Sequence, residues 1–68
     1  MKKNFLRLKN GNVELINYQG QRVITYYSKG DAVRVDWYEE DKESVEVLLK
    51  DGKIIIINKS CQRIKTIY

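Results

Sequence analysis

The stretch LKDGKIIIINKSCQRIKTIY, residues 49–68, decides the fold of this chain because it repeats an earlier one. Residues 8–27 read LKNGNVELINYQGQRVITYY, and the two stretches align without a gap, with nine of twenty positions identical. We interpret this match as an internal repeat. The alternative is that the two stretches match by convergence, because both follow the residue pattern of a β-hairpin, and that no duplication produced them.

Each copy contains a strong hairpin signal. Asn10-Gly11 and Asp51-Gly52 both suit a type I′ turn, whose two central residues need φ > 0. Alternating or β-branched runs flank each turn, and Asn17 and Asn58 stand where a strand would end. Each copy is therefore expected to form a three-strand meander.

Residues 32–38 alternate between apolar and polar side chains and predict one further strand between the copies. The charged residues 39–44 are typical of a solvated connection. The sequence thus predicts an all-β fold in a single domain, residues 1–68, with about six to seven short strands. Such spacing favours a small antiparallel β-barrel or sandwich. The expected size is that of an SH3 domain, a likeness that carries no function.

Length and composition limit how this fold can be stabilised. The chain has 68 residues, one cysteine and no histidine, which leaves no intrachain disulfide and few ways to build a zinc site. Chains this short bury a thin core and often rely on a second subunit. We therefore expect a homo-oligomer, most simply a homodimer.

Comparison of the two copies predicts which side chains face the core. Neighbouring residues on a strand point to opposite faces. The predicted core residues are aliphatic in both copies or share one face of the 32–38 strand: Leu6, Leu8, Val13, Leu15, Val23, Val47, Leu49, Ile54, Ile56, Ile64, Val33, Val35 and Trp37. The predicted outward apolar residues, expected to form an interface, are Ile16, Ile24, Leu48, Ile55 and Ile57.

Charge is segregated along the chain, and the missing residue types argue against catalysis. The net charge is +4, with an acidic middle between two basic ends. There is no histidine for acid–base chemistry and no glycine-rich phosphate loop, and Cys61 has no histidine partner, so no enzyme, metal or cofactor is expected.

Cations and aromatic residues alternate along several expected strands. Small β-barrels bind single-stranded nucleic acid with such surfaces, because cations follow the phosphates and aromatic rings stack on bases. The predicted nucleic-acid or anion-binding residues are Arg22, Tyr26, Arg34, Tyr38, Arg63, Lys65, Gln21 and Gln62. The competing interpretation is that the tyrosines form cross-strand pairs and the cations keep the surface hydrated.

One polar pattern occurs twice, as Asn-x-x-x-Gln-Arg at residues 17–22 and 58–63. It predicts either two anion pockets, each with an arginine fork and an amide, or two structural loops in which asparagine closes a strand. The structural interpretation is preferred because asparagine commonly has this role in turns.

Taken together, the residues indicate a small non-enzymatic binding module that contacts single-stranded nucleic acid through its Arg/Tyr strand face. The alternative is a protein–protein interaction or self-assembling accessory or inhibitor protein that uses the isoleucine-rich face. A free thiol and the lack of an apolar leader or membrane segment predict a cytoplasmic location with no membrane contact. Many isoleucines and lysines beside a single alanine suggest an AT-rich coding genome, such as that of a phage or mobile element.

Overall fold

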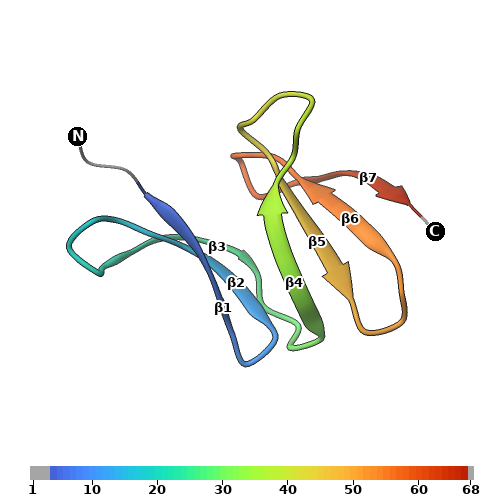
Figure 1. Ribbon diagram of the computed structural model, residues 1–68, viewed down its shortest axis with the longest axis horizontal. Coiled ribbons are helices and arrows are strands. Elements are labelled where there is room, and N and C mark those ends of the chain that lie inside the picture. The colour runs from blue at the N-terminus through green and yellow to red at the C-terminus, as the bar shows by residue number, and fades with distance from the viewer. Residues whose placement is uncertain (1–3, 68) are drawn as a thin grey trace.

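The structure, a computed structural model, describes residues 4–67, which form seven antiparallel strands in two sheets (Figure 1). The strands of the first sheet are β1 (Phe5–Lys9), β2 (Asn12–Ile16) and β3 (Arg22–Tyr27). Those of the second sheet are β4 (Ala32–Trp37), β5 (Val45–Leu49), β6 (Ile54–Ile57) and β7 (Arg63–Ile67). The described residues contain no helix, so the all-β prediction is confirmed.

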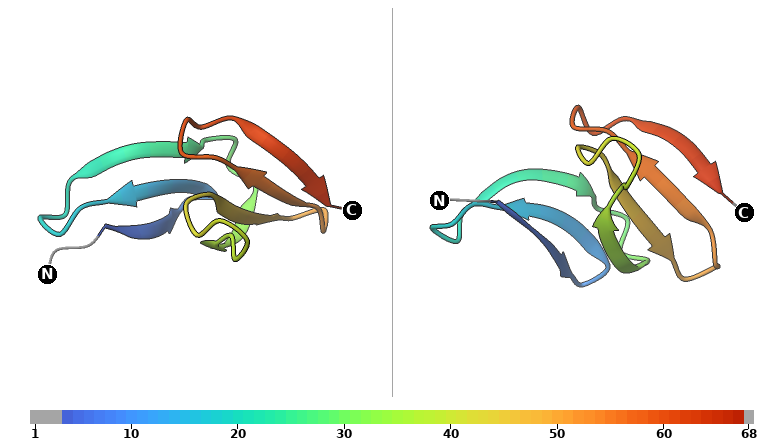
Figure 2. Two further views of the ribbon diagram at one scale, coloured as in Figure 1. Left: turned by 90° about the horizontal axis from the view of Figure 1, so that it is seen from above. Right: turned by 45° about the horizontal axis from the view of Figure 1, so that its top comes forward.

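The two sheets form an open, curved arrangement and not a closed barrel. Each copy of the repeat is a meander, and β4 is added to the second one, next to β5. In Figures 1 and 2, β1 runs beside β4 while β3 curves behind them toward the loop that joins β6 and β7. The barrel alternative is wrong because the strands belong to two separate hydrogen-bonded ladders; a small sandwich fits the arrangement.

Three turns meet at one end of the molecule and join the sheets. The N–H of Ala32 donates to the carbonyl of Gly11 (3.0 Å), and the N–H of Lys50 donates to the carbonyl of Asp31 (2.9 Å). Gly11 has φ +78°, and a Cβ atom on it would lie 2.1 Å from the carbonyl oxygen of Gly30. Only glycine allows the first hairpin to approach the β3–β4 turn this closely.

The two repeated asparagine loops have the same hydrogen-bond pattern. The Oδ1 atom of Asn17 accepts the N–H groups of residues 19 and 21, both at 2.9 Å, and that of Asn58 accepts those of residues 60 and 62, at 3.0 and 2.9 Å. Gly20 and Cys61 occupy the same place in each loop, and both have positive φ. The structural interpretation of the two asparagines is confirmed.

The β1–β2 turn and the β5–β6 turn differ in length, and this difference reverses the predicted faces of β6. Asn10 and Gly11 both have positive φ and form the expected two-residue turn, in which Leu8 lies opposite Val13. In the second copy Gly52 alone has positive φ, three residues form the turn, and Leu48 lies opposite Ile54. A shift of one residue turns every side chain of a strand to the other face.

The core consists of residues from both sheets that face each other. Its buried members are Val13, Leu15, Tyr26, Tyr27, Ala32, Val45, Val47, Leu49, Ile55 and Ile57. The prediction that Ile55 and Ile57 are exposed is therefore wrong, as is the inward assignment of Ile54 and Ile56. Ile56 is fully buried, but it lies on the other face, between Glu46 on β5 and Lys65 on β7.

Ile16 is also buried, although it was predicted to be an exposed interface residue. It is 1% exposed, because β2 is the central strand of its sheet and Ile16 lies between Phe5 on β1 and Arg22 on β3. The two remaining predicted interface residues, Ile24 and Leu48, are half-buried.

Four predicted core residues are exposed instead: Leu8, Val23, Val33 and Ile64. The last three share one cause, since each is skipped in the pairing of its strand and lies at a β-bulge. A bulge interrupts the alternation of faces and re-aims side chains. The other predicted core residues are buried or half-buried.

Candidate functional site

The predicted binding residues do not form one surface. Arg22 lies on the outer face of the first sheet, whereas Tyr26 and Arg63 line a pocket between the sheets. Arg34, Tyr38 and Lys65 belong to the second sheet and its margin, outside that pocket, and Gln21 and Gln62 lie in the asparagine loops. The bulges at Val23 and Ile64 explain why residues that alternate in the sequence do not share a face.

Arg22 is not available as an isolated cation. Its Nη1 lies 3.9 Å from Oε2 of Glu14, while Nη2 of Arg7 lies 2.6 Å from Oε1 of the same carboxylate. The hydrogen bond from Arg7 is the main cause that lowers the pKa of Glu14. These three residues form a small charged network on the outer face of the first sheet.

Arg34 is surrounded by acidic residues. It lines a pocket with Asp36, Glu39 and Glu46 on the outer side of β4 and β5. Because these carboxylates would repel phosphate, the surface around Arg34 opposes nucleic-acid binding. The hydroxyl of Tyr38 donates to Oε2 of Glu40 (2.7 Å), and this bond is the main cause that raises the pKa of Tyr38.

The pocket between the sheets has a different chemistry. It has a volume of about 290 Å³, and its lining combines two isoleucines of β6, two tyrosines of β3 and groups from the adjoining turns and β7: Ile55, Ile57, Tyr26, Tyr27, Ser28, Lys29, Cys61 and Arg63. No lining residue is acidic. The predicted binding residues include Tyr26 and Arg63 but not Tyr27 and Lys29. The only sequence signal for Lys29 was its place among the cations that alternate with the tyrosines.

The two arginines of the repeat therefore have different surroundings. Arg22 pairs with Ile16 on the outer face, whereas Arg63 pairs with Ile57, which faces the core and the pocket. The reversed face of β6 causes this difference, because Arg63 on β7 lies opposite Ile57 on β6 and therefore faces the same side of the sheet. The two arginines therefore do not form equivalent anion pockets, which was the less favoured interpretation of the repeated Asn-x-x-x-Gln-Arg pattern.

Tyr27 connects the pocket to the turn at its edge. Its hydroxyl donates to Oδ1 of Asp31, and its side chain is buried. Burial and, next, the hydrogen bond to Asp31 raise the pKa of Tyr27 to about 12, against a smaller opposing effect of the positive charge of Arg63. The phenol stays neutral at ordinary pH and fixes the wall of the pocket.

Alkaline pH is expected to destabilise the fold between about pH 10 and pH 12. The ordinary pKa of tyrosine is 10.0 and that of Tyr27 in the folded chain is about 12. Its stabilising contribution is complete below pH 10 and is lost as pH rises to 12, because the unfolded chain ionises first. Urea titrations across this range should show a smaller loss of stability in Tyr27→Phe than in wild type. Tyr18→Phe, at a ring that is 55% exposed, is the control and should retain the wild-type slope; equal slopes in all three proteins would contradict this assignment.

Cys61 lies at the rim of the pocket. Its Sγ lies 3.5 Å from the backbone carbonyl oxygen of Thr25, so the β6–β7 loop contacts β3 of the other sheet. No histidine or carboxylate lies beside this exposed thiol among the residues that line the pocket. Its position is explained by the contact between the two sheets.

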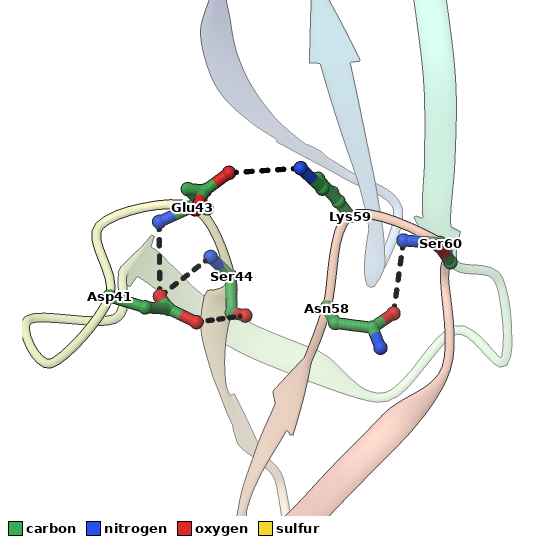
Figure 3. Close-up of polar contacts among 6 residues, drawn as sticks. All are labelled: Asp41, Glu43, Ser44, Asn58, Lys59 and Ser60. Atoms are coloured by element: carbon green, nitrogen blue, oxygen red, sulfur yellow. Dashed lines mark hydrogen bonds and ion pairs between the residues drawn. The ribbon is translucent and has the colours of Figure 1, made fainter.

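A second set of polar contacts holds the β4–β5 loop and the β6–β7 loop, which lie at one end of the second sheet (Figure 3). Nζ of Lys59 lies 3.1 Å from Oε1 of Glu43, joining the β6–β7 loop to the β4–β5 loop. Asp41 accepts the N–H groups of Glu43 and Ser44 and the Ser44 hydroxyl, and the Ser44 N–H is the main cause of its lowered pKa. These carboxylates therefore have a structural role in the loop.

Comparison with family models, with curated proteins and with solved structures gave no match. Among residues 4–67, no group of histidine, cysteine, aspartate or glutamate side chains is arranged to hold a metal ion. The same residues include no helix of the length and apolar character that crossing a membrane requires.

Proposed function

We propose that this chain is a non-enzymatic module that binds single-stranded nucleic acid at the pocket between its sheets. The observation that carries the proposal is that two cations, Lys29 and Arg63, line a pocket together with two isoleucines. Neither cation forms an ion pair with another described residue, in contrast to Arg7, Lys53 and Lys59. Unpaired cations beside aromatic rings are the usual means of holding phosphate and base together.

The size and lining of the pocket support a single nucleotide unit. Its volume of about 290 Å³ lies at the low end of small-molecule sites. Ile55 and Ile57 offer an apolar contact for a base, while Lys29 and Arg63 can each contact a phosphate oxygen. The acidic residues near Arg34 would direct the rest of the strand away from that side.

Removal of both pocket cations is expected to weaken the binding of a fluorescein-labelled single-stranded oligonucleotide strongly, as measured by fluorescence anisotropy. For wild type, log K should fall with log[salt] with a slope of about −1.4, since each neutralised phosphate of a single strand contributes about −0.7. Lys29→Gln and Arg63→Gln together should weaken binding by about a hundredfold or more, because each of the two charged hydrogen bonds contributes roughly 1.5–3 kcal/mol. Arg22→Gln is the matched control, since its cation already lies beside Glu14.

Two outcomes would overturn this proposal. One is a salt-independent affinity in wild type, and the other is an equal loss in the control and the double variant.

Light scattering on the same samples would detect the second candidate function, self-association. That alternative is supported by Ile64 and Ile67 on β7, which are 52% and 39% exposed at an edge of the sheet. A cytoplasmic location, supported by the free thiol of Cys61, belongs to the same proposal.

A further inference from the structure

Two adjoining pockets on the acidic side of the second sheet form one groove. They share Asp36, Trp37 and Glu39. The first, of about 220 Å³, is completed by Arg34, Glu46 and Leu48, and the second, of about 400 Å³, by Tyr38 and Lys42. Three acidic residues, two aromatic residues and two cationic residues thus line the groove, so negative charge exceeds positive charge by one.

We propose that this groove binds the cationic side chains of an arginine- or lysine-bearing peptide segment. Cations are attracted to the faces of tryptophan and tyrosine rings. Trp37 is half-buried and packs against the core, so its ring is held in place before a ligand arrives. The groove therefore offers a fixed aromatic surface next to negative charge.

The register of the sheet supplies an independent reason for a cationic ligand. Asp36 on β4 lies directly opposite Glu46 on β5. Like charges in such cross-strand positions are destabilising. Neither carboxylate forms an ion pair with a residue of the described chain. Arg34 and Lys42 also line the groove, but neither forms an ion pair with these two carboxylates, and a bound cation would relieve the repulsion between them further.

The free oxygens of the groove are suited to this role. Oδ1 of Asp36 accepts the backbone N–H of Trp37 (2.8 Å), which fixes the Asp36 carboxylate against its own strand. Glu39 is exposed and Glu46 is half-buried, so the groove offers carboxylates at two depths. The positive charge of Arg34 repels a cationic ligand, so removing this charge is expected to strengthen binding.

Tryptophan fluorescence provides a direct test, because Trp37 is the chain's single tryptophan. Titration with tetra-arginine, which has no aromatic residue, should change the Trp37 emission in a saturable, salt-sensitive manner, and tetra-glutamate should not. Glu39→Gln should weaken tetra-arginine binding by about two- to fivefold, in the range of an exposed ion pair. Arg34→Gln should strengthen it by a similar factor, because a like charge is removed. Glu43→Gln, whose carboxylate contacts Lys59 outside the groove, should bind as wild type does.

Glu46→Gln separates binding from folding. This change should raise the Tm, since the repulsion with Asp36 disappears, and it should also weaken tetra-arginine binding. No saturable change in wild type, or a Glu46→Gln protein with lower Tm, would overturn the proposal. Emission that changes with protein concentration alone would also overturn it, by showing that a second copy occupies the groove.

Discussion

Replacing Gly11 with alanine is expected to destabilise the fold by at least about 3 kcal/mol. The positive φ of Gly11 alone should cost an alanine roughly 1–2 kcal/mol. The added Cβ atom would also lie 2.1 Å from the carbonyl oxygen of Gly30, a backbone atom that cannot rotate away. The two turns would have to separate, and the hydrogen bond from Ala32 to Gly11 would be lost with them.

This loss is large for a chain of 68 residues. Typical stabilities of roughly 0.05–0.15 kcal/mol per residue correspond to about 3–10 kcal/mol in total. Urea denaturation should therefore show either a much lower midpoint with an unchanged slope or a chain that is unfolded without urea. Either result would identify the contact between the β1–β2 and β3–β4 turns as a main connection between the sheets.

Gly20→Ala and Gly52→Ala are matched controls for this prediction. Both glycines have positive φ, but a Cβ atom on either would meet nothing within 4 Å. Each variant should lose only the conformational cost, about 1–2 kcal/mol. Equal losses in all three proteins would show that the close approach to Gly30 contributes nothing and would contradict the proposed connection.

Local chemistry explains which parts of the fold the sequence predicts correctly. Asn10-Gly11 forms its two-residue turn because glycine and asparagine accept positive φ without help from the rest of the chain. Asn17 and Asn58 close their loops with hydrogen bonds to residues two and four positions ahead. Such features depend on a few neighbouring residues and can be predicted from them.

Face assignment depends on longer-range pairing and could not be predicted from the repeat. Asp51-Gly52 resembles Asn10-Gly11, yet its turn has one more residue, so β6 presents Ile55 and Ile57 to the core. The run from Ile54 to Ile57 is apolar on both faces, and hydrophobicity alone therefore allows either register.

The pocket was only partly predictable for the same reason. Arg63 comes from β7, Lys29 from the β3–β4 turn and Ile57 from β6, and packing of the two sheets brings them together. Strand alternation predicts neighbours on one strand, but bulges and the contact between sheets set this group. The prediction of a cation and tyrosine site is therefore retained as a proposal, with its residues reassigned.

Ile55→Ala is expected to cost about 2–5 kcal/mol, whereas Ile64→Ala should cost less than about 1 kcal/mol. Ile55 is 1% exposed in the core between the sheets, and its truncation leaves a cavity. Ile64 is 52% exposed at a bulge, where truncation removes little buried area. The two variants remove the same atoms from the same residue type, so urea midpoints compare their positions directly. The register implied by the repeat reverses this order, because it turns Ile64 inward and Ile55 outward. A larger loss in Ile64→Ala would thus exclude the three-residue turn at 50–52 and the pocket formed on Ile55 and Ile57.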